Sequence, residues 1–149
     1  MDILSAMVKL QAIQAALAIT VPVAMSVKRT YLWIPSQSST MPDLPAWLNT
    51  YQLQRTDSVN RRFTSLYTVN MNLVLKDADL ARAGHIALAF HVALKAALEV
   101  EVNQTLTSTV NEKSNYRTAR EMPAVLEISK QAFVGLSELL DLRIVTTMT

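Results

Sequence analysis

The fold of this chain is decided by Phe63-Thr-Ser-Leu-Tyr-Thr-Val-Asn-Met-Asn-Leu-Val-Leu75. The odd positions of this stretch are apolar except for Ser65, and most of the even positions are polar, including Thr64 and Asn70. Successive side chains of a strand point to opposite faces of the sheet. The alternation therefore predicts a half-buried strand of the antiparallel kind.

The predicted strand runs directly into a predicted helix. Asp77 offers a side-chain oxygen to the free amide groups of the first turn, as N-cap residues do. Apolar side chains then recur at the spacing of one helical face, at Leu80, Ala83, Ala87, Phe90 or His91, Leu94 and Leu98. A strand leading into a long helix favours a structural α+β scaffold rather than a reaction centre.

The composition narrows the class of protein without naming a function. The chain has 149 residues, of which 50% are hydrophobic, and we expect a single domain over residues 1–149. It has no cysteine, which excludes disulfides and thiolate chemistry. The net charge is only +2, but residues 19–76 carry six bases against two acids, and residues 77–149 carry seven bases against nine acids. Opposite signs in the two halves suit self-association as well as simple solvation.

The N-terminal segment predicts an amphipathic helix over about residues 2–19, ended by Pro22. One helical face carries Ile3, Met7, Leu10, Ile13 or Gln14, and Leu17. Asp2, Gln11 and Gln14 disfavour a secretion signal, and the apolar run is too short to span a bilayer, which takes about 20 residues. The expected fold is α+β, with a small, mostly antiparallel sheet packed with this helix and one long central helix.

The middle of the chain predicts a second strand. Residues 30–34 are rich in β-forming side chains, and residues 35–45 hold three prolines, which indicates a mobile surface loop. Alternating side chains over residues 46–55 predict a strand, and residues 56–62 contain Asp57, Ser58 and Asn60, which are typical of a turn. The two long strands would then form an antiparallel pair.

The C-terminal third leaves an alternative open. Residues 104–110 are rich in threonine and favour a strand, and residues 112–121 are charged and favour a loop. Residues 133–147 alternate and predict a strand, against a rival helix over residues 123–140.

The predicted strands are long for a domain of this size, since a strand of thirteen residues spans about 44 Å. We expect part of a strand to project or to pair with a neighbouring subunit, unless a bulge near Ser65 or Gly135 divides it.

Enzymatic motifs are missing from the sequence. With Gly84 and Gly135 as its only glycines, the chain has no phosphate-binding loop. His85 and His91 are six residues apart, about 240° around a helix, so they cannot chelate one metal ion. We expect one to be half-buried and the other exposed. Asp77 and Asp79 fit capping better than catalysis. We therefore expect no enzyme activity and no catalytic, cofactor or metal site.

The order of the elements resembles the tail terminator proteins of long-tailed bacteriophages. The resemblance rests on the N-terminal helix, the Leu44-Pro45-Ala46 strand opening, the alternating strand, the helix Asp79-Leu-Ala-Arg-Ala and the final strand Asp141-Leu-Arg-Ile-Val-Thr-Thr. Residues 111–122 extend beyond the family pattern. The family implies an α+β virion subunit that forms a six-membered ring on the last tail-tube ring, stops tube growth and offers its other face to the head connector.

This resemblance implies partners but no catalytic residues. The expected partners are further copies of the chain, the tail tube protein, the head–tail connector or neck proteins, and DNA passing through the lumen without sequence specificity. A membrane is not among them. The expected location is the tail–neck region of the virion, after assembly in the host cytoplasm. Arg55, Arg61 and Arg62 cluster around the predicted turn and are the candidate contacts to a subunit, the tail tube or the DNA path.

Two other functions stay open. Neck, head-closure and tail-tube proteins share ring symmetry and strand-rich subunits, so the sequence separates them poorly from a terminator. From a different class, a cytoplasmic ligand-binding domain would line an apolar pocket with Trp33, Trp47 and Tyr51.

Overall fold

The computed structural model describes residues 3–32, 43–76, 80–99, 115–116, 121–128 and 131–147. These residues form an α+β fold with a mostly antiparallel sheet. The elements are α1 (Ile3–Ala15), β1 (Ala18–Ile19), β2 (Met25–Ser26), β3 (Arg29–Tyr31), β4 (Ala46–Val59), β5 (Arg62–Leu75), α2 (Leu80–Glu99), β6 (Asn115–Tyr116), β7 (Glu121–Ile128) and β8 (Gln131–Thr147).

The main sheet has the strand order β3-β4-β5-β8-β6, and β7 also pairs with β8. All neighbours are antiparallel except β3 and β4, which run parallel over three residue pairs. The short strands β1 and β2 form a separate two-stranded sheet. Strands β4, β5 and β8 are therefore the long central strands, and β5 lies between the other two.

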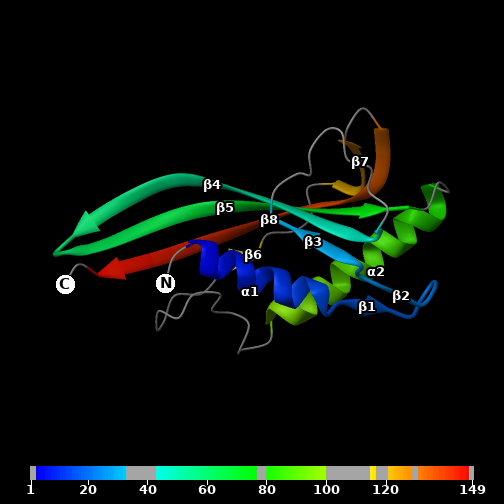
Figure 1. The fold of residues 1–149 in the computed structure, drawn as a ribbon, viewed down its shortest axis with the longest axis horizontal. Helices are drawn as coiled ribbons and strands as arrows, with labels where there is room; N and C mark the ends of the chain where they lie inside the picture. The colour runs from blue at the N-terminus through cyan, green and yellow to red at the C-terminus, as the bar shows by residue number, and fades with distance from the viewer. Residues whose placement is uncertain are drawn as a thin grey trace.

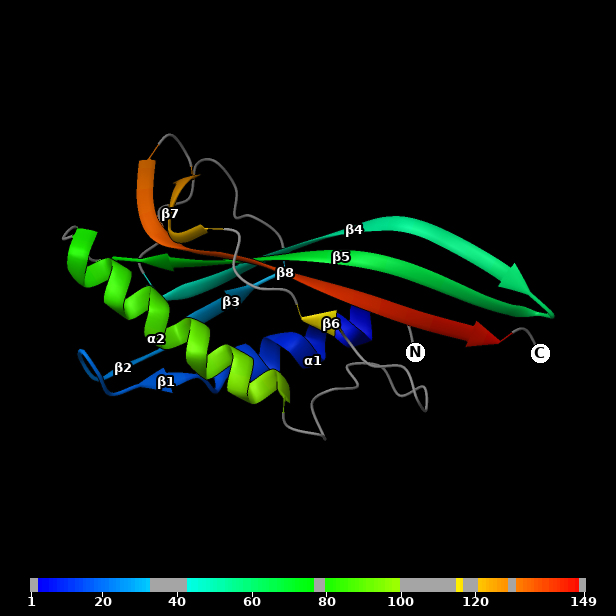
Figure 2. The same ribbon diagram turned by 180° about the vertical axis from the view of Figure 1, so that it is seen from behind.

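Both helices and the β1–β2 hairpin lie on one side of the main sheet (Figures 1 and 2). At one end of the molecule, β4, β5 and β8 continue beyond α1 to a tip close to the C-terminus (Figure 1). The far end holds the β1–β2 hairpin and the start of α2. The expectation that a strand projects is thus confirmed for three strands together.

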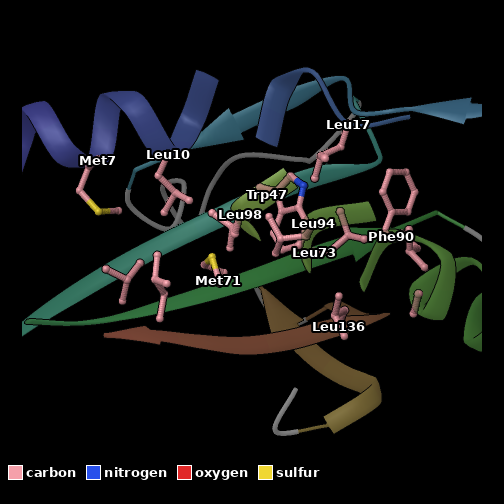
Figure 3. Close-up of a cluster of buried hydrophobic side chains, with 14 of the residues drawn as sticks. Met7, Leu10, Leu17, Trp47, Met71, Leu73, Phe90, Leu94, Leu98 and Leu136 are labelled. Atoms are coloured by element: carbon pink, nitrogen blue, oxygen red, sulfur yellow. The ribbon is translucent and has the colours of Figure 1, made fainter. Parts of the chain in front are cut away.

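The core lies between the helices and the sheet (Figure 3). Its largest fully buried side chains are Trp47, Phe90, Met7, Leu10, Met71, Leu73, Ile86, Leu94 and Leu136. The predicted helical face of α2 is confirmed, because Ala83, Ala87, Phe90, Leu94 and Leu98 are all buried. A smaller cluster of Ala46, Leu48 and Val74 lies on the opposite face of the sheet.

The predicted strand over residues 63–75 is confirmed as β5, and so is its antiparallel pairing with the strand that begins at Ala46. The predicted turn over residues 56–62 contains the observed turn but is too long. Strand β4 continues to Val59, which pairs with Arg62, so the turn consists of Asn60 and Arg61 alone. Both residues have positive φ, 49° and 62°, as in the two-residue turns whose twist matches that of the flanking strands. Pairing with β5 overrides the turn preference of Asp57 and Ser58.

The β5–β8 pairing runs without interruption past Ser65 and Gly135, and the bulges lie in the strands beside them. One is in β7, opposite Gly135 and Ser137, and the other is in β4. Leu53 pairs with Tyr67 and Arg55 pairs with Leu66, so Gln54 is the extra residue on the bulged strand. Up to Leu53, the odd residues of β4 point toward the helices. Beyond the bulge, the odd residues Arg55, Asp57 and Val59 point to the opposite face, because paired residues share a face.

The N-terminal helix matches its prediction only in part. It ends at Ala15 instead of residue 19, because Ala18 and Ile19 pair with β2, and Pro22 lies between those two strands. The predicted face is buried at Met7, Leu10, Gln14 and Leu17. The opposite side is not polar, since Leu4 and Val8 are each 57% exposed. This weakens the predicted amphipathic character.

The final strand is confirmed and the rival helix over residues 123–140 is wrong. Residues 131–147 form β8, and Pro123 lies in β7, which pairs with it. Part of the predicted loop over residues 112–121 is strand instead, since β6 and the start of β7 lie there. The predicted strand over residues 104–110, the loop over residues 35–42, Trp33, Asp77 and Asp79 lie outside the described residues.

Candidate assembly surfaces

The first candidate surface is the projecting end of the sheet, which we call the arm. It consists of residues 52–68, which form the end of β4, the turn and the start of β5, and of residues 141–147 of β8. Strand β4 is buried at residues 46–49 and exposed at every position from 52 to 59. Its apolar side chains are not covered, since Leu53 is 50% and Val59 is 67% exposed. Exposed apolar side chains on an extended strand are typical of a contact surface.

The arm has two open edges within the described part of the chain. On the outer side of β4, β3 pairs only with residues 46–48. On the outer side of β8, β7 pairs up to Ser137 and β6 pairs with Leu140 and Asp141. Residues 50–59 and 142–147 thus present backbone donors and acceptors along their outer sides. Such edges are templates for pairing with another chain.

The register places most of the predicted arginines on one face of the arm, turned away from the helices. Arg55 and Arg143 both pair with Leu66, one from each neighbouring strand, and Arg62 lies four residues nearer the tip. Arg61 is in the turn. The sequence had indicated that Arg55 lies around the turn. It lies in strand β4 instead. Arg143 was missed, because only strand pairing brings it beside Arg55.

Local acids reduce the charge of this face but do not cancel it. Arg55 Nε lies 3.4 Å from Asp57 Oδ2, and the two side chains are 67% and 62% exposed. An ion pair this exposed contributes little stability. The arm carries four arginines against Asp57 and Asp141. A shallow hollow of about 440 Å³ at the tip is lined by Asp57, Val59, Asn60, Arg62 and Thr64.

The second candidate surface is a groove between α2 and the β1–β2 hairpin. Its volume is about 600 Å³, and it is lined by Ala18, Ile19, Thr20, Val21, Pro22, His85, Leu88, Ala89, Val92, Ala93 and Ala96. Val21, Leu88 and Val92 are 75%, 50% and 58% exposed. The β1–β2 hairpin, which supplies part of this lining, lies at the end of the molecule away from the arm tip (Figure 1).

Two buried polar pairs hold the helices on the sheet. Gln14 of α1 and Asn49 of β4 exchange side-chain hydrogen bonds of 2.9 and 2.7 Å, and neither residue is exposed. His91 Nδ1 of α2 donates a hydrogen bond to Glu138 Oε1 of β8, with Glu138 fully buried and the His91 side chain 15% exposed. As expected, His85 is exposed. Glu138 lies on the apolar face of β8, and its pairing with His91 follows only from the packing of α2 on the sheet.

In the part of the chain that the structure describes, no group of three or more histidine, aspartate or glutamate side chains has the arrangement of a metal site. Trp47 is fully buried in the core, and Tyr51 packs edge-on against Tyr67 with a centroid distance of 6.0 Å. Of the described helices, none combines the length and the apolar character needed to cross a membrane.

Comparisons with protein-family models, with curated proteins and with solved structures give no significant match.

Proposed function

We propose that this chain is a structural subunit that assembles with further copies of itself into a ring. The observation that carries the proposal is the arm, whose tip extends beyond α1 (Figure 1) and which exposes two strand edges. Strands β4 and β8 both run toward the tip, because each is antiparallel to β5. The two edges differ in sequence. A contact that joins the β4 edge of one copy to the β8 edge of the next is therefore head-to-tail. Head-to-tail contacts form a ring when the rotation between neighbouring copies closes, and an open filament when it does not.

In this proposal the ring is the tail terminator of a long-tailed bacteriophage. It has six subunits, caps the last ring of the tail tube protein, ends tube polymerisation and joins the tail to the head–tail connector or neck proteins. DNA passes through the lumen without sequence specificity. The protein resides in the tail–neck region of the virion. The basic face of the arm supports this role, because a sixfold ring repeats Arg55, Arg61 and Arg62 as a collar of like charge.

Another neck, head-closure or tail-tube ring protein is the second candidate. The same arm supports it, because all these assemblies need a subunit with two unlike contact edges. The ligand-binding alternative is weaker. Trp47 belongs to the core and Tyr51 packs on Tyr67, so neither lines the two hollows described above.

Ring formation is tested on the purified full chain by mass photometry. Six chains of 16.6 kDa give particles of about 100 kDa. The variant Leu53→Lys/Val59→Lys places charges on the arm, at positions already exposed, and lysine on an edge strand opposes pairing. We expect this variant to fold and to give particles smaller than the ring. Leu4→Lys, exposed on α1, is the matched control and should still assemble. Assembly of the arm variant equal to that of the control would reject the arm contact.

The terminator role is tested by omitting the protein during phage assembly. Tails should then grow to uncontrolled length and fail to join heads. Tails of normal length in its absence would exclude the terminator role and leave the neck candidate.

A further inference from the structure

Helix α2 has an exposed face whose spacing is that of a helix-packing seam. Its positions are Ala81, His85, Leu88, Val92, Lys95 and Glu99, all of them exposed. They are separated alternately by four and three residues, the spacing with which two helices pack side by side. At the centre lie Leu88 and Val92, which are 50% and 58% exposed. This face points away from the core, which α2 contacts through Phe90 and Leu94.

The seam is symmetric about position 90. Leu88 and Val92 are two residues from this centre, His85 and Lys95 are five, and Ala81 and Glu99 are nine. Two antiparallel helices related by a two-fold axis juxtapose residues at equal distances from the axis. Leu88 of one copy then meets Val92 of the other. Arg82 is exposed beside Ala81, so it lies within reach of the partner's Glu99. Both ends of the pair thus bring opposite charges together.

We propose that the outer face of α2 is a docking surface for α2 of a second copy of this chain, packed antiparallel across a two-fold axis. The neighbouring groove of about 600 Å³ gives room for the second helix. The small side chains of Ala89, Ala93 and Ala96 let that helix approach α2 closely. Val21 is 75% exposed at the rim of the groove and adds apolar contact. The arm of a second copy fits less well, because its arginines would meet Arg82 and Lys95.

This contact goes beyond the proposed ring and uses a different surface. The β1–β2 hairpin beside α2 lies at the end of the molecule away from the arm tip, so α2 pairing and arm pairing use separate surfaces (Figures 1 and 2). A two-fold contact is also distinguishable from a ring contact by its geometry. It joins position 88 to position 92, whereas pairing of the arms leaves these positions apart.

Cysteine cross-linking tests the geometry directly, since the natural chain has no cysteine. Full-length Leu88→Cys and Val92→Cys variants are mixed and oxidised. We expect a covalent dimer in at least tenfold higher yield than from Leu88→Cys mixed with Leu4→Cys, whose residue is exposed on α1. Equal yields from the two mixtures would overturn the proposal.

Charge reversal gives a second, independent test. The background protein is the Leu53→Lys/Val59→Lys variant, in which the arms are kept apart. When Arg82→Glu or Glu99→Arg alone is added to it, dimerisation measured by sedimentation velocity should weaken at least fivefold. The combined Arg82→Glu/Glu99→Arg variant should recover most of it. Concentration-independent sedimentation as a monomer, or a combined variant as weak as the single ones, would overturn the proposed pairing.

Discussion

Asn49 and Glu138 lie opposite the same residue of the central strand, Met71, one on each side of it. All three side chains point toward the helices and are fully buried. Asn49 is hydrogen-bonded to Gln14 of α1, and Glu138 is hydrogen-bonded to His91 of α2. One row across the sheet therefore contacts both helices, and in each case a buried polar pair makes the contact. A buried polar group that loses its partner raises the free energy of the folded state. The row therefore opposes sliding of either helix along the sheet.

The first prediction concerns the pair between α2 and β8. His91→Leu removes the hydrogen bond that α2 supplies to a fully buried carboxyl group, so the free energy of unfolding should fall by about 2–4 kcal/mol. His85→Leu, at an exposed position of the same helix, should change it by only about 0.5 kcal/mol or less at protein concentrations too low for α2 pairing. Urea denaturation of both variants measures the difference. Equal stability of the two variants would mean that the buried pair contributes nothing.

The second prediction concerns the pair between α1 and β4. Gln14→Leu removes both side-chain hydrogen bonds to Asn49, which keeps its bond of 3.2 Å to the Tyr31 carbonyl oxygen. We expect a loss of about 1–3 kcal/mol. The double variant Gln14→Leu/Asn49→Leu should lose less than the sum of the single losses, since neither partner then remains. Strict additivity in the thermal or urea unfolding of the three variants would argue against coupling.

The third prediction uses the two faces of β5. Met71 is fully buried, whereas Asn70 is half-buried on the opposite face, where it accepts a hydrogen bond of 3.4 Å from Ser137. Met71→Asp should cost several kcal/mol and give an insoluble or unfolded protein, because the core offers a new carboxylate no partner. Asn70→Asp should melt close to the parent. The reverse order of melting temperatures would invert the assignment of the faces.

The sequence predicted the parts of the fold that periodicity controls. Strand β5, the buried face of α2 and the alternation of β8 all follow from side chains that must share a face. The end of α1 at Ala15 could not be predicted, because Leu17 continues the helical spacing and only pairing of Ala18 and Ile19 with β2 overrides it.

The geometry of the arm depends on pairing that the sequence does not display. The bulge at Gln54 leaves no local signal, yet it turns Arg55 to the face of Arg62 and Arg143. The sequence does not reveal the two-residue turn, because Arg61 occupies a position of positive φ where glycine is more common. Local turn preferences therefore spread the predicted turn over seven residues. Arg61 and Arg62 lie at the turn as predicted, but Arg55 lies in β4, and the face that Arg55 shares with Arg62 follows only from the register.

The last prediction concerns the basic face of the arm. Arg55 is exposed, and Arg61 and Arg62 lie at the tip, so Arg55→Glu/Arg61→Glu/Arg62→Glu should leave the melting temperature within a few degrees of the parent. In phage assembly this variant should fold normally, but its tails should fail to join heads. Each subunit changes by six charge units, and a ring multiplies that change by the number of its subunits. Lys9→Glu/Lys28→Glu/Lys76→Glu makes the same change in net charge at exposed positions outside the arm. If that control variant fails to the same extent, net charge and not the arm face decides docking; if the arginine variant supports normal tails joined to heads, these three side chains make no essential contact.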